Sequence, residues 1–128
     1  MEFPNLPYII DDDVKITETL AIMKYVAKKW KPELLGRNAA EVGRVNMLEY
    51  HVFMLKMKST MACYNPEAVL EDIITECRPM LAKIVEVTGQ HAYLAGDNIT
   101  YLDFMFVELL DLLNFLSQGS FYTEFPSL

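Results

Sequence analysis

Apolar residues recur with helical spacing from about residue 39 to about residue 117, and this pattern constrains the fold more than any other feature. It predicts three helices, over residues 39–62, 67–88 and 100–117. The last of these is apolar on nearly every side, so we expect it at the centre of a helical bundle. Thr100 and Asp103 form the pattern of a capping box at its start. Most of the chain is therefore expected to be helical.

The residues before this region predict a β-hairpin and one more helix. β-branched and aromatic residues at positions 8–10 and 14–16 suit strands, and the aspartates between them tolerate turn geometry. Thr17 is expected to cap the helix that follows, which should end near Trp30. Residues 31–38 contain Pro32 and Gly36 among mixed charges, and they form the predicted linker.

The composition fits a folded domain and argues against nucleic acid as a partner. Of the 128 residues, 52% are hydrophobic, which is enough to form a buried core. The 18 acidic and 11 basic residues give a formal charge of −7, which would repel a phosphate backbone. Cys63 and Cys77 fit neither a disulfide framework nor a zinc site, and His51 and His91 have no partner at ligand spacing. We therefore predict no metal site.

The sequence predicts neither a membrane span nor a signal peptide. The most apolar stretch, residues 102–116, is interrupted by Asp103, Glu108 and Asp111 and is too short to cross a bilayer. The first ten residues have two prolines and no basic cluster. With the two unpaired cysteines, this predicts a soluble protein of the cytoplasm or another reducing compartment, and it leaves attachment to a larger, organellar assembly open.

The helix predicted over residues 39–62 carries two apolar rows. The first row is expected to face the core and consists of Val42, Val45, Leu48, Val52 and Leu55. The second row, which we call the Met stripe, consists of Met47, Tyr50, Met54, Met57 and Met61. A row of this kind is often part of a core, but here the first row already supplies the core face. We therefore predict that the Met stripe is a surface for a protein partner or for self-association.

Four stretches of the sequence resemble the glutathione transferases. They are Phe3-Pro4-Asn5-Leu6-Pro7-Tyr8, Ile16-Thr17-Glu18-Thr19-Leu20-Ala21-Ile22 with Tyr25-Val26-Ala27, Cys63-Tyr64-Asn65-Pro66, and Leu94-Ala95-Gly96-Asp97-Asn98-Ile99-Thr100-Tyr101-Leu102-Asp103-Phe104. They occur in the family's order over nearly the whole chain, and the Cys-Tyr-Asn-Pro stretch is similar to the mu class. The resemblance implies a mainly α fold: a partial thioredoxin-like hairpin and helix over residues 1–31, then an all-helical C-terminal domain over residues 39–128.

The resemblance also implies an expectation about catalysis. The chain matches the family from just before its third strand, so the family's first strand, first helix and second strand have no counterpart here, and similar proteins continue beyond the last residue. In the mu class the glutathione thiolate is stabilised by a tyrosine of that first strand. Because only the thiolate is a competent nucleophile, we expect this chain to have lost catalysis, and we predict no catalytic residue.

Two segments correspond to the family's glutathione-binding residues. Asn5, Leu6 and Pro7 match the segment whose main chain pairs with the cysteinyl part of glutathione, with a cis proline at Pro7. Glu18 and Thr19 stand where the mu class has the Gln-Ser pair that holds the γ-glutamyl carboxylate at the start of a helix. Each has a structural alternative: Pro7 shapes the entry to a strand, and the other pair complements the helix dipole. Glutathione is therefore a candidate ligand.

Two further positions bear on the resemblance. Tyr64 is similar to the second mu-class tyrosine, which donates a hydrogen bond on the side of the electrophile, and the alternative is simple packing at a helix end. Met54 stands where mu-class dimers contribute an acidic residue across their interface. That contact is therefore expected to be lost here, because an apolar side chain takes the place of the acidic one.

Two functions from different classes are compatible with these features. The first is a mu-like glutathione transferase family protein that has lost catalysis and acts as an interaction subunit of a larger assembly. The alternative is an incomplete form of an active transferase that conjugates glutathione to electrophiles. In either case the strand at residues 8–10 lies at an uncovered edge, and a two-stranded hairpin is marginal in water. We therefore expect a partner chain, a swapped second copy or the missing part of a longer natural product to cover it.

Overall fold

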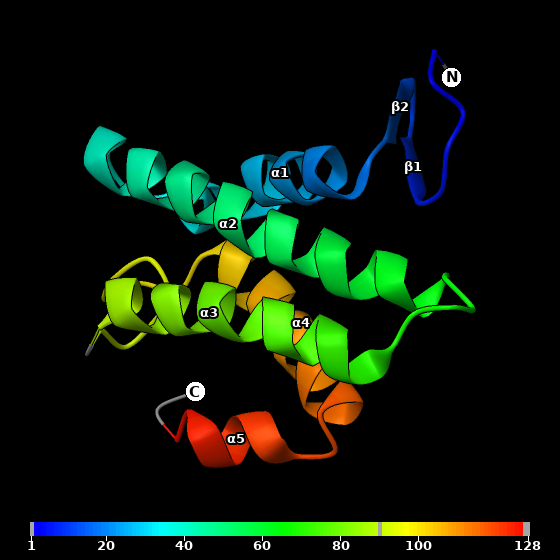
Figure 1. Cartoon of the computed structure of the whole chain (residues 1–128). Helices are drawn as coiled ribbons and strands as arrows, with labels where there is room; N and C mark the ends of the chain where they lie inside the picture. Colours follow the sequence, from blue (N-terminus) through cyan, green and yellow to red (C-terminus); the bar gives the residue numbers. More distant parts are fainter. Residues whose placement is uncertain (1, 90, 127–128) are drawn as a thin grey trace.

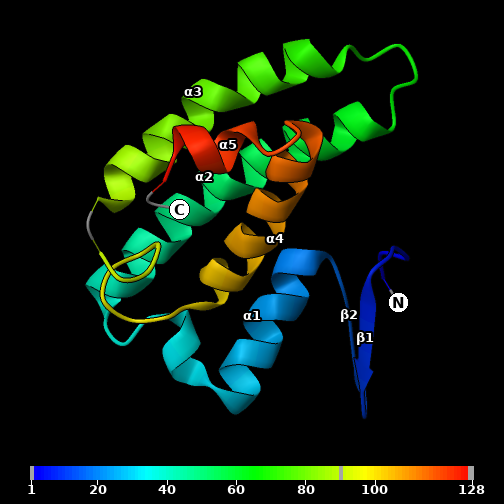
Figure 2. The same cartoon turned by 90° about the horizontal axis from the view of Figure 1, so that it is seen from below.

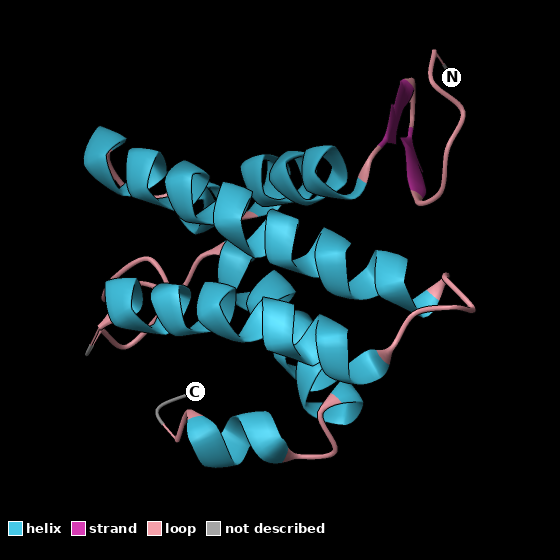
Figure 3. Cartoon of the chain, in the orientation of Figure 1, coloured by secondary structure: helices cyan, strands magenta, loops and turns pink. Residues whose placement is uncertain are grey.

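The structure, a computed structural model, describes residues 2–89 and 91–126, and it consists of a small hairpin attached to a helical bundle (Figure 1). The elements are β1 (Tyr8–Asp11), β2 (Val14–Thr17), α1 (Thr19–Trp30), the 3-10 helix η1 (Pro32–Leu35), α2 (Ala39–Cys63), α3 (Leu70–Thr88), α4 (Tyr101–Leu116) and α5 (Ser120–Glu124). Figure 3 shows that helices make up most of the chain, as the sequence predicts. The predicted fold class is confirmed.

The hairpin forms from two short segments rich in β-branched and aromatic residues, which a tight turn joins, and the residues of β1 alternate between exposed and half-buried. β1 and β2 pair antiparallel, from Tyr8 opposite Thr17 to Asp11 opposite Val14. Asp12 in the turn has a φ of 51°, a conformation that aspartate tolerates better than most residues. Tyr8 and Ile10 on β1 remain 53% and 57% exposed. One apolar face of the hairpin is therefore open within the described part of the chain.

The predicted cap of α1 is wrong. Thr17 pairs with Tyr8 as the last residue of β2, and its hydroxyl donates to the Phe3 carbonyl at 2.8 Å. Glu18 takes the capping position instead and makes no capping hydrogen bond with its side chain. Strand pairing competes with capping for the same residue, and here the strand extends one residue further than the sequence suggests.

The hairpin is held to α1 through one carboxylate. The Tyr25 hydroxyl donates to Asp11 Oδ2 at 2.6 Å, and the Lys29 ammonium forms a salt bridge with the same oxygen. These hydrogen bonds, that of Lys29 first, hold the pKa of Asp11 below its ordinary value. These two contacts connect the end of β1 to α1.

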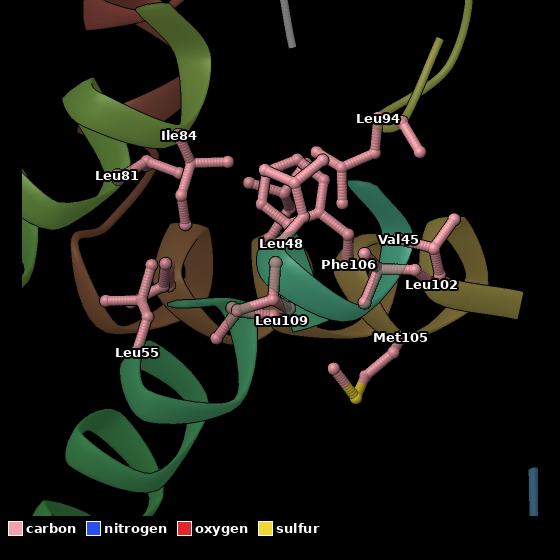
Figure 4. Close-up of a cluster of buried hydrophobic side chains, with 14 of the residues drawn as sticks. Val45, Leu48, Leu55, Leu81, Ile84, Leu94, Leu102, Met105, Phe106 and Leu109 are labelled. Carbon is pink, nitrogen blue, oxygen red and sulfur yellow. The ribbon is translucent and has the colours of Figure 1, made fainter. Parts of the chain in front are cut away.

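The core lies where α2, α3 and α4 meet, and α4 is the central helix, as predicted (Figure 4). Seven residues of α4 are buried: Tyr101, Leu102, Met105, Phe106, Leu109, Leu110 and Leu113. They pack against the first apolar row of α2, of which Val45, Leu48, Val52 and Leu55 are buried. Cys77, Leu81 and Ile84 of α3 also belong to the cluster, as do Leu94 and Ala95 of the loop before α4 and Phe121 of α5.

Helix boundaries follow local hydrogen bonds. The capping box of α4 is present, and the Asp103 carboxylate accepts from the Thr100 amide at 2.6 Å. The predicted start of α3 near residue 67 is wrong, because the Asn65 side chain accepts from the Glu67 amide at 3.1 Å and a turn occupies the residues before Val69. Gly89, at a φ of 61°, ends α3 as predicted.

A buried carboxylate of α2 connects α1 to α2 and α4. Glu49 of α2 is only 9% exposed, and Lys24 of α1 lies 2.6 Å from its Oε2. The Tyr101 hydroxyl at the start of α4 donates to the same oxygen. This network, which we call the Glu49 cluster, ties the N-terminal helix to the bundle.

The Glu49 cluster predicts a pH dependence of stability. Burial, and then the hydrogen bond to Glu49, raise the pKa of Tyr101 above its ordinary value of 10.0. The folded chain therefore keeps this proton above pH 10, where an unfolded chain loses it, so stability falls as pH rises through that range, by about 1 kcal/mol per unit. Urea unfolding between pH 9 and 11 should show a smaller fall for Tyr101→Phe than for the original chain. If the stability of both proteins fell equally with pH, the Tyr101 hydroxyl would not be the cause of the pH dependence.

None of the helices in the described part of the chain is both long enough and apolar enough to cross a membrane.

Candidate functional site

The residues before β1 lie against the junction of β2 and α1. The Asn5 side-chain amide donates to Glu18 Oε1 at 2.9 Å, and Asn5 Oδ1 accepts from the Leu6 amide at 2.9 Å. The Thr17 hydroxyl donates a hydrogen bond to the Phe3 carbonyl. The structure thus brings together two segments that the sequence singled out separately, and the Asn5–Glu18 contact itself was not predicted.

The peptide bond between Leu6 and Pro7 is cis. Pro7 directly precedes β1, and Leu6 is 77% exposed. This segment therefore lies at the surface beside the start of α1, where a ligand could reach it.

Glu18 has an unusual backbone. Its φ is 74°, a conformation that residues with side chains rarely adopt and that costs about 1–3 kcal/mol. Its carbonyl still accepts from the Ile22 amide at 3.0 Å, so this conformation begins α1 directly. Glycine would adopt this φ without strain, so a strained residue with a side chain is expected where that side chain has a function. Strained residues of this kind cluster at functional sites.

The start of α1 is suited to an anion. The first amides of a helix have no partner within it, and they carry the positive end of the helix dipole. Glu18 does not cap them, because its carboxylate bonds to Asn5 instead. Thr19, the first residue of the 12-residue helix, is half-buried. A carboxylate could therefore bind the amides of α1, while Glu18 would attract an ammonium group on the same ligand.

Tyr64 lies at the C-terminal end of α2 and is 79% exposed. Packing at the helix end does not account for so exposed a ring. In Figures 1 and 2 this end of α2 and the hairpin lie on the same side of the molecule. Within the described residues Tyr64 makes no side-chain hydrogen bond, and it is not in contact with the Asn5–Glu18 pair.

The Met stripe forms one exposed face of α2. Met47, Tyr50, Met54, Met57 and Met61 are 50%, 63%, 43%, 39% and 57% exposed. Their spacing keeps them within about 80° of the helix circumference, on a different side from the buried row. The predicted separation of two apolar rows is confirmed, and only the first row is buried by this chain.

Candidate metal ligands are not clustered in the described part of the chain. Among residues 2–89 and 91–126, no three His, Cys, Asp or Glu side chains are grouped so as to hold a metal ion. Cys63 is exposed and Cys77 is buried, and both are free. His91 Nδ1 lies 3.3 Å from Asp97 Oδ1 in the exposed loop before α4.

Comparison with known proteins identifies two family models along the chain. Residues 1–28 match the model of the N-terminal domain of glutathione S-transferase, and residues 49–128 match that of the C-terminal domain. The exact division into domains over residues 1–31 and 39–128 stays a prediction.

Similar curated proteins cover the whole chain. Glutathione S-transferase class-mu 26 kDa isozyme 51 of Fasciola hepatica is 36% identical over 130 residues, which is 100% of this chain and 58% of that protein. Glutathione S-transferase 2 of Gallus gallus is 33% identical over 100% of this chain and 56% of its own length. Glutathione S-transferase Mu 1 of Rattus norvegicus is 36% identical over 87% of this chain and 51% of its own length.

The chain thus spans a little over half the length of the first two relatives. The two family models match in the order N-terminal domain, then C-terminal domain, and the hairpin lies within the first match. The chain belongs to the glutathione S-transferase family and is similar to its mu-class members.

Proposed function

We propose that this protein is a glutathione-binding subunit that associates through the Met stripe and the open hairpin, and that these 128 residues do not conjugate glutathione by themselves. The observation that carries the association is the exposure of five apolar side chains, 39–63% each, along one face of α2. An apolar face of this length is typical of an interaction surface. The two free cysteines fit a cytoplasmic or other reducing compartment.

Glutathione is proposed as the ligand of Asn5, Leu6, Pro7, Glu18 and Thr19. A γ-glutamyl moiety carries an ammonium group and a carboxylate. The carboxylate of the strained Glu18, which also bonds to Asn5, would attract the ammonium group, and the open amides of α1 would bind the carboxylate. The exposed main chain before β1 would pair with the rest of the tripeptide. Tyr64 is proposed to face an electrophile or an apolar ligand on the same side of the molecule.

The absence of conjugation is proposed on chemical grounds. A thiol near its ordinary pKa is mostly protonated at neutral pH, and a transferase needs a donor that stabilises the thiolate. The mu-class tyrosine with that role has no counterpart in these residues. The alternative is that the chain is an incomplete form of an active transferase, in which residues outside these 128 supply the donor. The two functions differ in the activity of a longer protein that contains these residues, and both predict an inactive chain when it is assayed alone.

The first test of the glutathione site uses its strained residue. Glu18→Gly should raise the free energy of unfolding by about 1 kcal/mol, because glycine adopts a positive φ without strain. The same change should weaken glutathione binding roughly tenfold, because the carboxylate that attracts the ammonium group is lost. Urea unfolding and titration calorimetry measure the two effects.

Glu18→Gln is the matched control, since it removes the charge and keeps the side chain and the strain. It should weaken binding without raising stability. If Glu18→Gly binds glutathione as tightly as the original chain, Glu18 is a structural residue only, and the proposed site is wrong.

The second test concerns the Met stripe. We expect the purified chain to self-associate, and Met54→Lys with Met57→Lys to return it to a 14.7 kDa monomer. Burying a lysine in an apolar interface should weaken association about 100-fold or more, whereas lysine keeps the helix propensity of methionine. Sedimentation equilibrium measures the mass, and circular dichroism checks the helix content.

Val69→Lys is the control for the Met stripe, because Val69 is equally apolar and 58% exposed but lies outside the stripe. It should leave the assembly unchanged. An original chain that sediments as a monomer at tens of micromolar, or a double variant that still assembles, would refute self-association through this surface.

A further inference from the structure

The methionines of this chain divide into two groups by burial. Seven of the eight lie in the described residues, and Met105 of α4, at 3% exposed, belongs to the core cluster (Figure 4). Met23 and Met80 are partly buried against the same cluster. The other four are the methionines of the Met stripe, and they are 39–57% exposed. The four most exposed methionines of the described chain therefore share one face of α2.

The methionines of the Met stripe follow one another on neighbouring turns of α2. Met54, Met57 and Met61 are three and four residues apart, which places the Cβ atoms of neighbours about 5–6 Å from each other. A thioether is an apolar group that a mild oxidant converts into a polar sulfoxide. An oxidant that reaches this face therefore meets a row of targets, and each conversion changes the same surface.

Cys63 is the other exposed sulfur group of α2, and it lies on a different side of the helix. At 100° per residue its side chain is turned about 160° from that of Met61. Its thiol donates to the Ser59 carbonyl, with 3.4 Å between sulfur and oxygen. Cys77 is buried. The response of the exposed thiol to an oxidant can therefore be separated from that of the Met stripe by changing Cys63 alone.

We propose that Met47, Met54, Met57 and Met61 are sites of reversible oxidation by a peroxide, and that their oxidation weakens association through the Met stripe. The assignment of the four sites rests on their exposure and needs no partner. The effect on association rests on the self-association put forward as part of the proposed function.

The forward step consumes one peroxide molecule for each methionine. The O–O bond breaks, one of its oxygen atoms forms a bond to the thioether sulfur, and that oxygen gives its proton to the other, which leaves as water when the oxidant is hydrogen peroxide. The sulfur loses two electrons and the peroxide gains them. A dithiol reverses the step with a methionine sulfoxide reductase: the sulfoxide oxygen leaves as water and the dithiol becomes a disulfide.

The sulfoxide oxygen is a polar group in the middle of an apolar surface. Burying it without a hydrogen-bond donor is unfavourable, so oxidation of Met54 and Met57 should weaken self-association about 100-fold. The same coupling works in the other direction, because association covers the sulfur atoms. The concentrated, assembled chain should therefore be oxidised more slowly at the Met stripe than the dilute chain.

The four sites are tested by the rate at which each methionine is oxidised. The dilute 128-residue chain is treated with hydrogen peroxide, and peptide mass spectrometry follows the methionines separately. Those of the Met stripe should be oxidised at least about tenfold faster than the buried Met105, and faster than Met23 and Met80. Equal rates for the Met stripe and Met105 would overturn the assignment.

The effect on association is tested by sedimentation equilibrium before and after the oxidant. The original chain should lose its assembly and regain it after treatment with methionine sulfoxide reductases and dithiothreitol. The matched variant changes all four methionines of the Met stripe to leucine, which keeps the apolar surface, the approximate volume and the helix propensity. It should assemble both before and after the oxidant, whereas Cys63→Ser should respond as the original chain does. Circular dichroism checks the helix content throughout.

Each part of the proposal has its own contradicting result. An oxidised original chain that stays assembled, or a four-leucine variant that the oxidant dissociates, would overturn the effect on association. Loss of the response in Cys63→Ser would assign it to the thiol and would overturn that effect as well. A chain that is a monomer before any oxidant would refute the self-association of the proposed function and the effect of oxidation on it, and the oxidation rates would still decide whether the four methionines are the modification sites.

Discussion

Lys24→Met is expected to lower the free energy of unfolding by about 2 kcal/mol. The change removes the cation of the Glu49 cluster and leaves a carboxylate whose side chain is 12% exposed with one remaining donor, Tyr101. Breaking a fully buried ion pair costs about 3–5 kcal/mol, and we expect less here because the Lys24 side chain is 40% exposed and partly solvated. Urea unfolding followed by circular dichroism measures the difference.

Replacing the whole cluster should recover most of this loss. In Lys24→Met, Glu49→Met, Tyr101→Phe no buried charge or hydroxyl is left without a partner, so we expect stability within about 1 kcal/mol of the original chain. Recovery in the triple variant would show that the loss arises from an uncompensated charge and not from altered packing.

Lys28→Met provides the matched control, because Lys28 is exposed on the same helix and forms no salt bridge within the described residues. It should change stability by less than about 0.5 kcal/mol. A Lys24→Met variant as stable as this control would mean that the Glu49 cluster does not hold α1 to the bundle.

Periodicity was sufficient to predict most of the fold. The rows of apolar residues in α2, α3 and α4 predict these helices to within a few residues, because a helix that buries one face must repeat its apolar residues every three or four positions. The same reasoning separates the buried row containing Leu48 from the exposed Met stripe. The helices and the two rows of α2 could be predicted from the sequence, because each depends only on the positions of residues along a single helix.

What the sequence did not predict depends on contacts between distant residues. Thr17 has the chemistry of a helix cap, but pairing with Tyr8 makes it the end of a strand. Glu49 looks like a surface residue among its neighbours, and only the approach of α1 and α4 makes it a buried partner of Lys24. The bond between Asn5 and Glu18 likewise joins residues 13 positions apart.

The candidate site was predictable in part. The resemblance singled out Asn5, Pro7 and Glu18 by motif, and the structure places Asn5 against Glu18. The positive φ of Glu18 has no sequence signal, because glutamate is not a residue that favours it. Strain at this position, beside the open amides of α1, is the strongest structural support for a ligand there.

We propose that these residues bind glutathione without activating it. Binding alone orients the thiol but leaves its pKa near that of the free tripeptide, so little thiolate is available at neutral pH. Any donor that lowered this pKa would increase the rate in proportion to the thiolate formed. Conjugation by the chain alone is therefore the property that tests this proposal most directly.

The decisive measurement is the rate at which the purified 128-residue chain conjugates glutathione to an activated aryl chloride at pH 7, beside Glu18→Gly as the control for the site. We predict a rate within roughly twofold of the uncatalysed reaction for both proteins. An acceleration of about 1,000-fold or more by the original chain, lost in Glu18→Gly, would contradict the account and identify the chain itself as a transferase.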